Sequence, residues 1–389
     1  MEKNNQIIYR NYLPGDEKGI VEVYNLAFQQ NIMGNLKTPN IFHWRYIDYP
    51  DFKPEQINVA IDSEINKIVG LVIGNVEKYI INNKIYKIGV INDVSTYPGY
   101  NKRGIAKNLM KMALNHFKNE DADFSMLTAD PNYHARKRIY VPLGFFNAMR
   151  IKVYFHFSNL ITLFKQLPPL IALSPLLILI KFISNFQILK NKISKKYKVE
   201  IQNSASEEFR LRFNEVCKMQ FDCFHELTKE EWNWCRLKCP IKMFEPTEIR
   251  IRERNTNKLI AGAIVQSGYI YSTTLGLKLR MGVAKNIFVD ERNIFNANSK
   301  NPKKINLELK NIYKLLFSLI SKASIHRKDS FIIFMSGIDF SMANWAAINS
   351  GWFRFLGPVH MVKEMKENLH FPRLSKIFYL DPGENFGKW

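Results

Sequence analysis

The chain has 389 residues, 46% of them hydrophobic, and its 56 lysines and arginines against 35 aspartates and glutamates give a net charge of +21. This composition excludes a disordered acidic chain, a collagen-like chain and a disulfide-stapled small protein, and the length predicts two domains. Four cysteines provide no disulfide framework, and the first residues carry no apolar stretch like that of a secretory signal. We therefore expect a cytoplasmic protein.

The net charge favours anionic ligands, because lysine and arginine release counterions from phosphates. No RNA- or DNA-binding motif accompanies the charge, and the chain is rich in lysine, asparagine and isoleucine together. We interpret the charge as a solvated basic surface and expect no nucleic-acid partner for the leading function given below.

Strands and helices alternate over the first 157 residues. A strand is predicted at 7–12, then a helix that Pro14-Gly15-Asp16 caps and that runs to about Phe28, and then β-branched runs that end in a strand over 88–96. Apolar residues recur every fourth position from Arg103 to Lys118, which predicts an amphipathic helix packed on a sheet. The pattern indicates an α/β domain.

Residues 158–198 differ in character. Leu160–Leu189 is largely apolar and broken by prolines, and a lysine-rich run follows it. Its charge-free stretch, Gln166–Ile180, is shorter than the about 20 residues that a spanning helix needs. Two interpretations stay open: a peripheral membrane contact anchored by the lysines, or a buried helical connector between domains.

Beyond residue 200 the sequence of the first half returns in weaker form, as four ordered matches at similar intervals. The pairs are Trp44–Pro50 with Trp234–Pro240, Asn66–Gly70 with Asn257–Gly262, Gly89-Val90 with Gly282-Val283, and Asp130–Phe145 with Asp339–Trp352. We therefore predict a duplicated α/β unit.

The stretch from Val94 to Ala106 has the pattern of a strand, a short basic turn and the start of a helix. Such a turn leaves the first backbone N–H groups of the helix unpaired at the positive end of the helix dipole, which suits a diphosphate. Gly104 lets an anion approach the backbone, and Lys102 and Arg103 add positive charge.

With its flanks, this stretch resembles motif A of the GCN5-related N-acetyltransferase (GNAT) superfamily, (Arg/Gln)-x-x-Gly-x-(Gly/Ala), and the resemblance covers about residues 6–157. Asn101, Gly104 and Ala106 occupy the motif positions, with Asn101 in place of Arg or Gln. The resemblance implies acetyl-CoA as acyl donor, with the strand before the turn pairing its backbone with the pantetheine arm. The residues implied in binding are Val94, Ser95, Thr96, Asn101, Lys102, Arg103, Gly104, Ile105 and Ala106.

A second landmark is Asp130-Pro131-Asn132, followed after a basic stretch by Tyr140 through Gly144-Phe145. The GNAT pattern ends in Tyr-x-x-x-Gly-Phe, and this tyrosine commonly protonates the departing CoA thiolate, a role that would fall on Tyr140. A phenol with an unperturbed pKa of about 10 can donate such a proton. Asn132 lies near the place where the family often has an asparagine that touches the cofactor.

Attack by an amine requires a base that removes the ammonium proton. Asp93, on the strand beside the acyl position, is the first candidate, and Glu77 on the preceding strand is a weaker one. In the Eis-type acetyltransferases, which the order Val-Ser-Thr-x-Pro resembles, the base is the C-terminal carboxylate, which would be Trp389 here.

The second half lacks a Gly-x-Ala turn, and Asp290 and Glu291 at the corresponding point would repel a diphosphate. We expect a single CoA site, in the first half, and a degenerate second copy that walls the acceptor cleft.

Cysteines at positions 217, 223, 235 and 239, with His225 among them, do not have zinc-site spacing at both ends. We expect buried free thiols and no metal.

The sequence thus predicts two tandem GNAT-like α/β domains with mixed, mostly antiparallel sheets flanked by helices. Residues 1–157 would form the acyl-CoA-binding catalytic domain, 158–198 an apolar and basic helical connector, and 199–389 the degenerate copy. The leading function is an N-acyltransferase that moves an acyl group, by default acetyl, from CoA to a primary amine by direct attack. The alternatives are a FemABX-like aminoacyl transferase fed by aminoacyl-tRNA and a non-catalytic CoA-binding scaffold.

Overall fold

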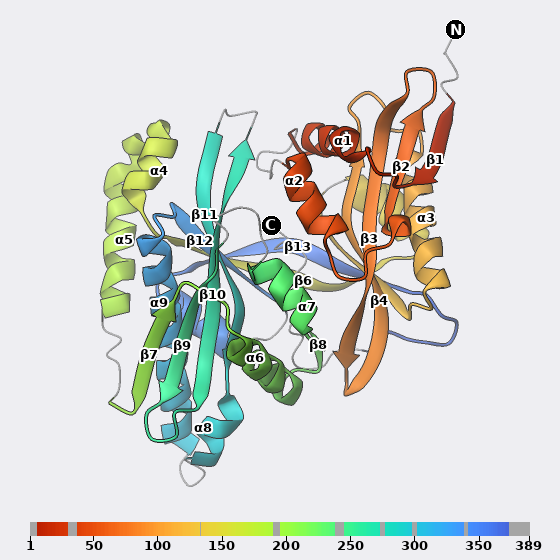
Figure 1. Cartoon of the computed structure of the whole chain (residues 1–389). Coiled ribbons are helices and arrows are strands. Elements are labelled where there is room, and N and C mark those ends of the chain that lie inside the picture. The colour runs from red at the N-terminus through yellow and green to blue at the C-terminus, as the bar shows by residue number, and fades with distance from the viewer. Residues whose placement is uncertain are drawn as a thin grey trace. The chain divides into compact units, whose positions relative to one another are not determined.

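The computed structural model describes residues 6–29, 37–132, 134–189, 195–237, 245–272, 277–297, 302–337 and 341–372 (Figure 1). The chain divides into two compact units. Unit 1 comprises Met1–Arg150, Ile270–Leu277 and Pro358–Arg373, and unit 2 comprises Ile151–Tyr269, Lys278–Gly357 and Leu374–Trp389.

Unit 1 is built on a mixed sheet. Its elements in chain order are β1 (Ile7–Asn11), α1 (Glu17–Gln29), α2 (Pro39–Phe42), the π-helical turn η1 (His43–Ile47), the 3-10 turn η2 (Pro54–Gln56), β2 (Ile57–Asp62), β3 (Lys67–Ile81), β4 (Lys84–Thr96), α3 (Ile105–Asn119), β5 (Phe124–Ala129), the turns η3 (Arg136–Tyr140) and η4 (Val141–Leu143), and the start of β6 (Phe146–Phe157). The strands lie in the order β1-β2-β3-β4-β5, with β13 (Phe353–Glu364) next to β5. β4 and β5 run parallel, whereas β1/β2, β2/β3, β3/β4 and β5/β13 run antiparallel.

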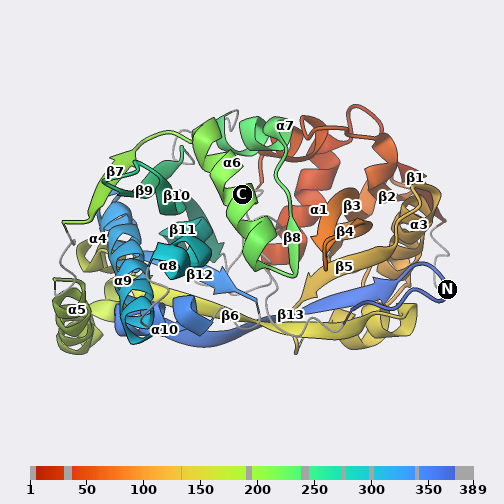
Figure 2. The ribbon, with the colours of Figure 1, turned by 90° about the horizontal axis from the view of Figure 1, so that it is seen from below.

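Two apolar cores cover the two faces of this sheet (Figure 2). α3 buries Ile105, Leu109, Ala113 and Phe117 against one face, as the four-residue spacing predicts, and α1 packs on the other. Gly89 on β4 permits the close approach of α3, because a Cβ at this position would overlap the Phe117 ring. The predicted α/β fold with a mixed sheet flanked by helices is confirmed.

Unit 2 also has a mixed sheet. Its elements are the rest of β6, α4 (Leu160–Gln166), the 3-10 turn η5 (Pro168–Leu173), α5 (Ser174–Leu189), β7 (Tyr197–Gln202), α6 (Glu207–Gln220), β8 (Cys223–His225), α7 (Lys229–Trp232), the π-helical turn η6 (Asn233–Leu237), β9 (Thr247–Glu253), β10 (Leu259–Ser272), β11 (Leu277–Val289), α8 (Glu291–Ala297), α9 (Pro302–His326), β12 (Phe331–Ser336), α10 (Ser341–Asn349) and the start of β13. The strand order is β6-β12-β11-β10-β9-β7, and β11 and β12 run parallel. α9 and α10 pack in one core of this unit, and α6 packs through Phe209 and Phe213 on Phe288.

Among the described elements, four strands have residues in both units: β6, β13, and the hairpin strands β10 and β11, of which Ile270–Ser272 and Leu277 belong to unit 1. Residues 152–157 of β6 pair with β12 in unit 2, although they follow the first half of the sequence. Residues 359–364 of β13, near the end of the described chain, pair with β5 in unit 1. The domain limits predicted from the sequence, 1–157, 158–198 and 199–389, do not include strands shared between units. Strand pairing is a long-range property, and local sequence patterns do not encode it.

The apolar segment 158–198 folds within unit 2 as α4, η5 and α5 and leads into β7, which is an edge strand of the sheet. Among the described residues, no helix is both long enough and apolar enough to cross a membrane.

Candidate active site

β4 separates from β5 at the point where the sequence predicts the acyl site. The parallel ladder joins Ile88–Ile91 to Phe124–Leu127 and stops there, although β4 continues to Thr96 and β5 to Ala129. On the other side, the pairing of β4 with β3 shifts register between Ile91 and Asp93, which makes Asn92 a bulge. The backbone edge of β4 over Asp93–Thr96 therefore has no strand partner on the β5 side within the described part of the chain.

Two buried polar atoms at this opening lack partners. The Ser95 hydroxyl oxygen and the Asn92 side-chain carbonyl oxygen are buried and accept or donate no hydrogen bond within the described residues. Unsatisfied buried polar atoms are rare in folded proteins and mark places where a ligand or water completes the bonding. The opening thus fits a polar ligand arm such as the amides of pantetheine.

The turn before α3 has the geometry of an anion site. Gly104 adopts φ +78° and precedes the helix without a side-chain cap, and the first helical bond runs from the Asn108 N–H to the Gly104 carbonyl at 3.1 Å. The N–H groups of Ile105 and Ala106 therefore have no acceptor in the helix. No atom lies within 4 Å of the position that a Cβ on Gly104 would take, so the approach to these groups is open.

The basic residues of the turn surround this approach. Asn101, Lys102 and Arg103 are exposed. The Arg103 guanidinium lies 4.7 Å from the centre of the Tyr100 ring, and the Tyr100 hydroxyl donates to Asp62 at 2.6 Å. The aromatic ring gives Arg103 a support while its charge remains accessible to solvent.

Asn132 and Tyr140 lie after β5. Asn132 is exposed, and its backbone N–H donates to the Asp130 carboxylate at 2.8 Å. Tyr140 ends η3 and is buried, with its ring edge-on to Phe145, and its carbonyl accepts from the Phe145 N–H at 3.1 Å. Gly144 closes this turn at φ +90°, a conformation that favours glycine.

Asp93 lies in a buried cluster of ionisable groups on the α1 side of the sheet. It faces that side because it pairs with Ile73, which belongs to the α1 core. The Lys37 ammonium donates to the Asp93 carboxylate at 2.6 Å and to the Tyr46 hydroxyl at 2.8 Å, and the Tyr46 hydroxyl also donates to Asp93. The Tyr24 ring lies 3.4 Å from the Lys37 nitrogen.

Helix α1 fixes the position of Lys37. The Asn25 side chain donates to the Lys37 carbonyl at 2.9 Å and accepts from the Lys37 N–H at 2.8 Å. The lysine is therefore held at both its backbone and its ammonium group.

Burial and charge set the protonation states of this cluster. Burial lowers the pKa of Lys37 to about 7, against the opposing effect of the Asp93 charge. Burial also acts to raise the pKa of Asp93, but the positive charges of Lys37 and Arg45 and two hydrogen bonds outweigh it, and that pKa is lowered. Burial raises the pKa of Tyr46 well above its usual value. Near neutral pH, Asp93 is ionised, Tyr46 is protonated and Lys37 titrates.

A series of hydrogen bonds connects the bulge at Asn92 with Glu77, the weaker candidate for the base. The Asn92 amide donates to Asn75 at 2.7 Å, and the Asn75 amide donates to the Glu77 carboxylate at 2.7 Å. Asn75 and Glu77 are both buried on β3. Glu77 is therefore connected to the opening through two amides.

Sequence reasoning missed Lys37, Tyr46 and His360. His360 lies on β13 opposite Thr128, with its Nδ1 3.4 Å from the Thr128 hydroxyl, and burial lowers its pKa to about 4, so the ring is neutral at pH 7. Tyr46 lies within the repeated Trp-to-Pro segment, which was a usable signal. Lys37 is 56 residues from Asp93 in the chain, and His360 is 232 residues from Thr128, so no local pattern marks either residue.

The corresponding strand-to-helix turn of unit 2 is already capped. The Asp290 carboxylate accepts from the Asn293 N–H at 3.0 Å at the start of α8 and forms an ion pair with Arg212. The N-terminus of α8 is therefore capped by an acidic side chain, whereas no side chain caps α3.

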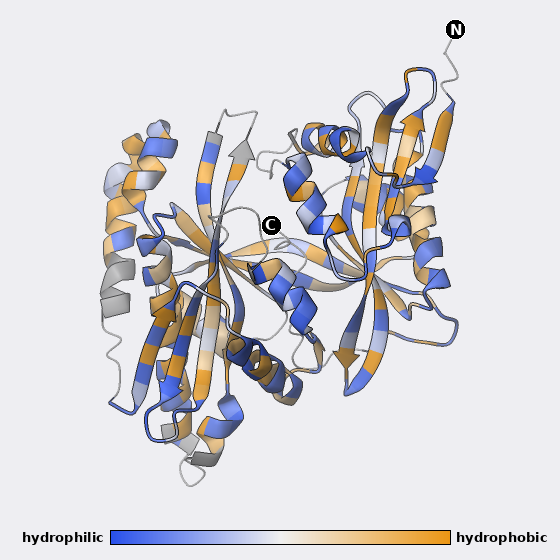
Figure 3. Cartoon of the chain, in the orientation of Figure 1, coloured by the Kyte–Doolittle hydropathy of each residue, from blue (hydrophilic) through white to orange (hydrophobic). Residues whose placement is uncertain are grey.

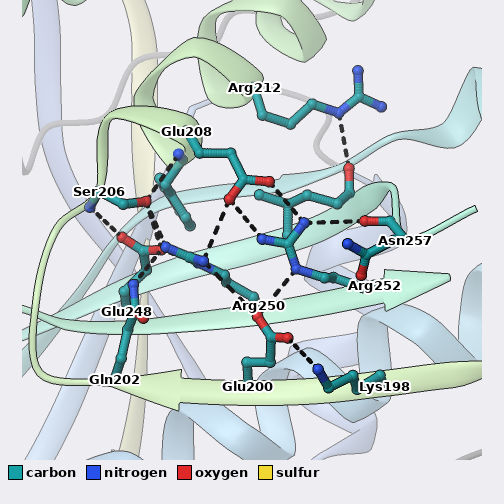
Figure 4. A network of polar contacts seen from close by, with 12 residues as sticks. Lys198, Glu200, Gln202, Ser206, Glu208, Arg212, Glu248, Arg250, Arg252 and Asn257 are labelled. Carbon is teal, nitrogen blue, oxygen red and sulfur yellow. Dashed lines mark hydrogen bonds and ion pairs between the residues drawn. The ribbon is translucent and has the colours of Figure 1, made fainter. Parts of the chain in front are cut away.

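Charged groups elsewhere in unit 2 are bonded to one another. Figure 4 shows Glu248 accepting from the Ser206 N–H at 2.6 Å and pairing with Arg250, while Arg252 joins Glu208 at 2.6 Å and Glu200 at 3.0 Å. Because each carboxylate in this network already has a donor, the arrangement supports the packing of α6 on β9 and β7 rather than chemistry.

The cysteine window holds no metal cluster within the described residues. Cys217, Cys223 and Cys235 are buried free thiols, and burial raises the pKa of Cys223 well above its usual value. Cys239 lies outside the described residues, as does Trp389, the residue that the Eis-type resemblance marked as a base.

Residues 9–147 match the acetyltransferase (GNAT) domain family. Saccharomyces cerevisiae N-myristoyltransferase, in a crystal structure with bound myristoyl-CoA and inhibitors, is similar over 92% of this chain and 80% of its own, at 12% identity and a TM-score of 0.65. A protein of unknown function from Enterococcus faecalis V583, described as a probable N-acyltransferase, covers 92% of this chain and 73% of its own at 10% identity and a TM-score of 0.56.

A GCN5-related N-acetyltransferase from Anabaena variabilis ATCC 29413 is similar over 93% of this chain and 73% of its own, at 11% identity and a TM-score of 0.56. No curated protein sequence matches the chain. At these identities the solved structures establish the fold. Residues 9–147 of unit 1 therefore match a GNAT acetyltransferase domain, and the chain shares its α/β fold with N-acyltransferases.

Proposed function

We propose that the chain is an acyl-CoA-dependent N-acyltransferase with its donor site in unit 1. The observation that carries this proposal is the unpaired edge of β4 beside the uncapped N-terminus of α3. The two features are consecutive in the chain, and they offer a hydrogen-bonding strand edge and an anion site to one ligand. The GNAT match over residues 9–147 and the fold shared with N-acyltransferases support it.

The donor would bind through the chain's own backbone. The edge of Val94, Ser95 and Thr96 would pair with the pantetheine amides, and the unpartnered Ser95 hydroxyl would add a bond. The turn from Asn101 to Ala106 would hold the diphosphate, with Lys102 and Arg103 supplying charge and Gly104 the open approach. The exposed Asn132 after β5 is the proposed additional contact.

Asp93 is the proposed proton acceptor for the attacking amine, and Lys37 controls it. While Lys37 holds its proton, the paired carboxylate is a weak base with a lowered pKa. Once Lys37 loses that proton near pH 7, the carboxylate regains basicity and the amine can itself accept a proton. Because the pKa of Lys37 is about 7, this change in the basicity of Asp93 would occur near neutral pH.

Tyr140 is the proposed donor of a proton to the leaving thiolate. It holds the tyrosine position of the Tyr-x-x-x-Gly-Phe pattern, and its backbone is fixed by the Phe145 N–H and by the Gly144 turn. A phenol that is already held in place loses little conformational freedom when it transfers the proton.

Unit 2 is the proposed degenerate repeat, with domain limits at 1–157, 158–198 and 199–389 apart from the exchanged strands. The order of strand, helix, π-helical turn, three strands, helix and strand recurs from β7 to β12, which supports a duplication. The capped turn at Asp290 supports a single donor site. Acetyl is the default acyl group, and longer chains are the alternative to be tested.

The test is calorimetric titration of the full chain with CoA, acetyl-CoA, octanoyl-CoA and myristoyl-CoA, repeated with Gly104→Glu. We expect micromolar binding that the variant weakens at least about 100-fold, because the added carboxylate repels the diphosphate and fills the open approach. Asn115→Glu, an equal charge change at an exposed position of α3, should leave binding unchanged. No binding of any acyl-CoA by the natural chain contradicts the proposal.

A further inference from the structure

Helices α4 and α5 of unit 2 carry many apolar residues (Figure 3), and several of these side chains are exposed to solvent. Six large apolar side chains within 22 residues are each more than half exposed, and the most exposed of them reach 70% for Ile161 and 68% for Phe182. We call these residues the α4–α5 face; they are Ile161, Ile171, Leu176, Ile178, Leu179 and Phe182. Isolated exposed apolar residues are normal, but a contiguous set marks an interaction surface.

The α4–α5 face is one side of a helix pair that is firmly attached on its other side. At about 100° per residue, Leu176, Ile178, Leu179 and Phe182 spread over an arc of roughly 160°, and the buried Leu177 lies opposite. The Lys181 ammonium donates to the Ser158 backbone carbonyl, and the Gln166 side-chain oxygen accepts from the Arg280 backbone N–H at 3.1 Å and from the Ser330 hydroxyl at 2.6 Å. The exposed arc therefore belongs to a fixed part of unit 2.

The positive charge of the segment around the α4–α5 face favours an anionic partner. Residues 158–199 contain seven lysines and no aspartate, glutamate or arginine, a local charge of +7. Lys165 on α4 and Lys195 after α5 are exposed, while Lys196 and Lys198 pair with glutamates of unit 2. An exposed apolar arc within a segment that has lysines but no acidic residue matches the interface of an anionic bilayer, where apolar groups enter the acyl boundary and lysines meet lipid phosphates.

We infer that the α4–α5 face docks the protein onto an anionic lipid surface, with α4 and α5 lying in the plane of the interface. The absence of a spanning helix among the described residues is consistent with a protein that lies on the membrane. The inference does not depend on acyl transfer.

The test is co-sedimentation of the full chain with vesicles of phosphatidylcholine alone and of phosphatidylcholine with one quarter phosphatidylglycerol. We expect at least fivefold more protein bound to the anionic vesicles at 0.1 M salt, and a marked loss of that preference at 0.5 M salt, because the Debye length shrinks. The double variant Leu179→Ser, Phe182→Ser should lower binding at least tenfold, since both removed groups are exposed and apolar. Charge reversal by Lys165→Glu, Lys195→Glu should abolish the anionic preference.

The matched control is Ile65→Ser, Ile85→Ser, two exposed isoleucines of unit 1, which should bind vesicles like the natural chain. All variants should keep the natural melting temperature, because the changed side chains are exposed. Equal binding by the Leu179, Phe182 variant overturns the inference, as does no binding to anionic vesicles. A dimer by light scattering that this variant converts to monomer would show that a second copy covers the face, and also overturns it.

Discussion

In each unit a π-helical turn contacts a long strand, and the side chains that make this contact differ in chemistry. In unit 1, Tyr46 lies two residues after Trp44 in η1 and bonds Asp93, four residues after Gly89 on β4. In unit 2, the residue two positions after Trp234 in η6 is Arg236, and it donates at 2.6 Å to Asn286, four residues after Gly282 on β11.

The contact between the π-helical turn and the central strand is thus structural in both units, and only unit 1 can move protons through it. A phenol, a carboxylate and an amine can exchange protons, and the pKa of Lys37 is about 7. A guanidinium and an amide cannot do so near neutral pH. The same kind of turn-to-strand contact thus accommodates either set of side chains, and of these two contacts the one in unit 1 contains groups that titrate near neutral pH.

The largest loss of turnover should come from giving unit 1 the uncharged side chain that unit 2 has at this contact. Asp93→Asn gives unit 1 the amide that unit 2 has, and we expect turnover to fall about 100- to 10,000-fold, because the proton acceptor is lost. The measurement is the rate of CoA thiol release with a panel of primary amines.

The reciprocal change, Asn286→Asp, is the matched control and should leave turnover within about twofold. Circular dichroism of both variants checks that the buried contacts still fold. Full activity in Asp93→Asn would show that the carboxylate is not the acceptor.

Tyr140→Phe tests the proposed transfer of a proton from Tyr140 to the leaving thiolate. We expect turnover to fall about 10- to 100-fold while acetyl-CoA affinity stays within about twofold, because the ring keeps its packing against Phe145 and only the hydroxyl is removed. Initial rates and calorimetric titration measure the two quantities. Tyr86→Phe on β4 should change neither. Unchanged turnover in Tyr140→Phe would favour another donor, or a scaffold without catalysis.

The titration of Lys37 should be visible in the pH profile. Because its pKa is lowered to about 7, the group is protonated below that pH, and turnover should rise about tenfold per pH unit up to pH 7 and level off above it. Asp93, Arg45, Tyr46 and Tyr24 are the charged or titratable groups that surround it.

Lys37→Met should remove this limb between pH 6 and 8, whereas Lys53→Met, which breaks the exposed pair with Glu120, should retain it. A limb that persists in Lys37→Met would assign the titration to another group.

The network of unit 2 should affect stability without affecting turnover. Glu248→Gln weakens a buried carboxylate pairing with Arg250, and we expect a loss of about 3 kcal/mol in the free energy of unfolding. Urea denaturation measures it, and turnover should stay within about twofold. Glu207→Gln, at a partly exposed pair with Arg210, should cost less than about 1 kcal/mol. A large loss of turnover in Glu248→Gln would contradict the separation of roles between the units.

Local patterns predicted much of unit 1. The helix expected over 103–118 is α3, Ile105–Asn119, and the predicted mixed sheet with flanking helices is observed. The open turn before α3 was predictable because its strand, glycine and helix N-terminus are consecutive, so that no long-range contact is needed to form it; its anion binding stays a prediction. The role of Tyr140 and of Asp93 in catalysis stays a prediction.

Sequence patterns alone gave the features that depend on near neighbours, namely the apolar period of α3, the glycine before this helix and the charge of the turn. Only the tertiary structure decided that Lys37 meets Asp93 across 56 residues and that His360 joins the sheet beside Thr128 across 232. Pairings of this kind are set by strand exchange and by the burial of polar groups that must find partners, and both depend on the whole chain at once.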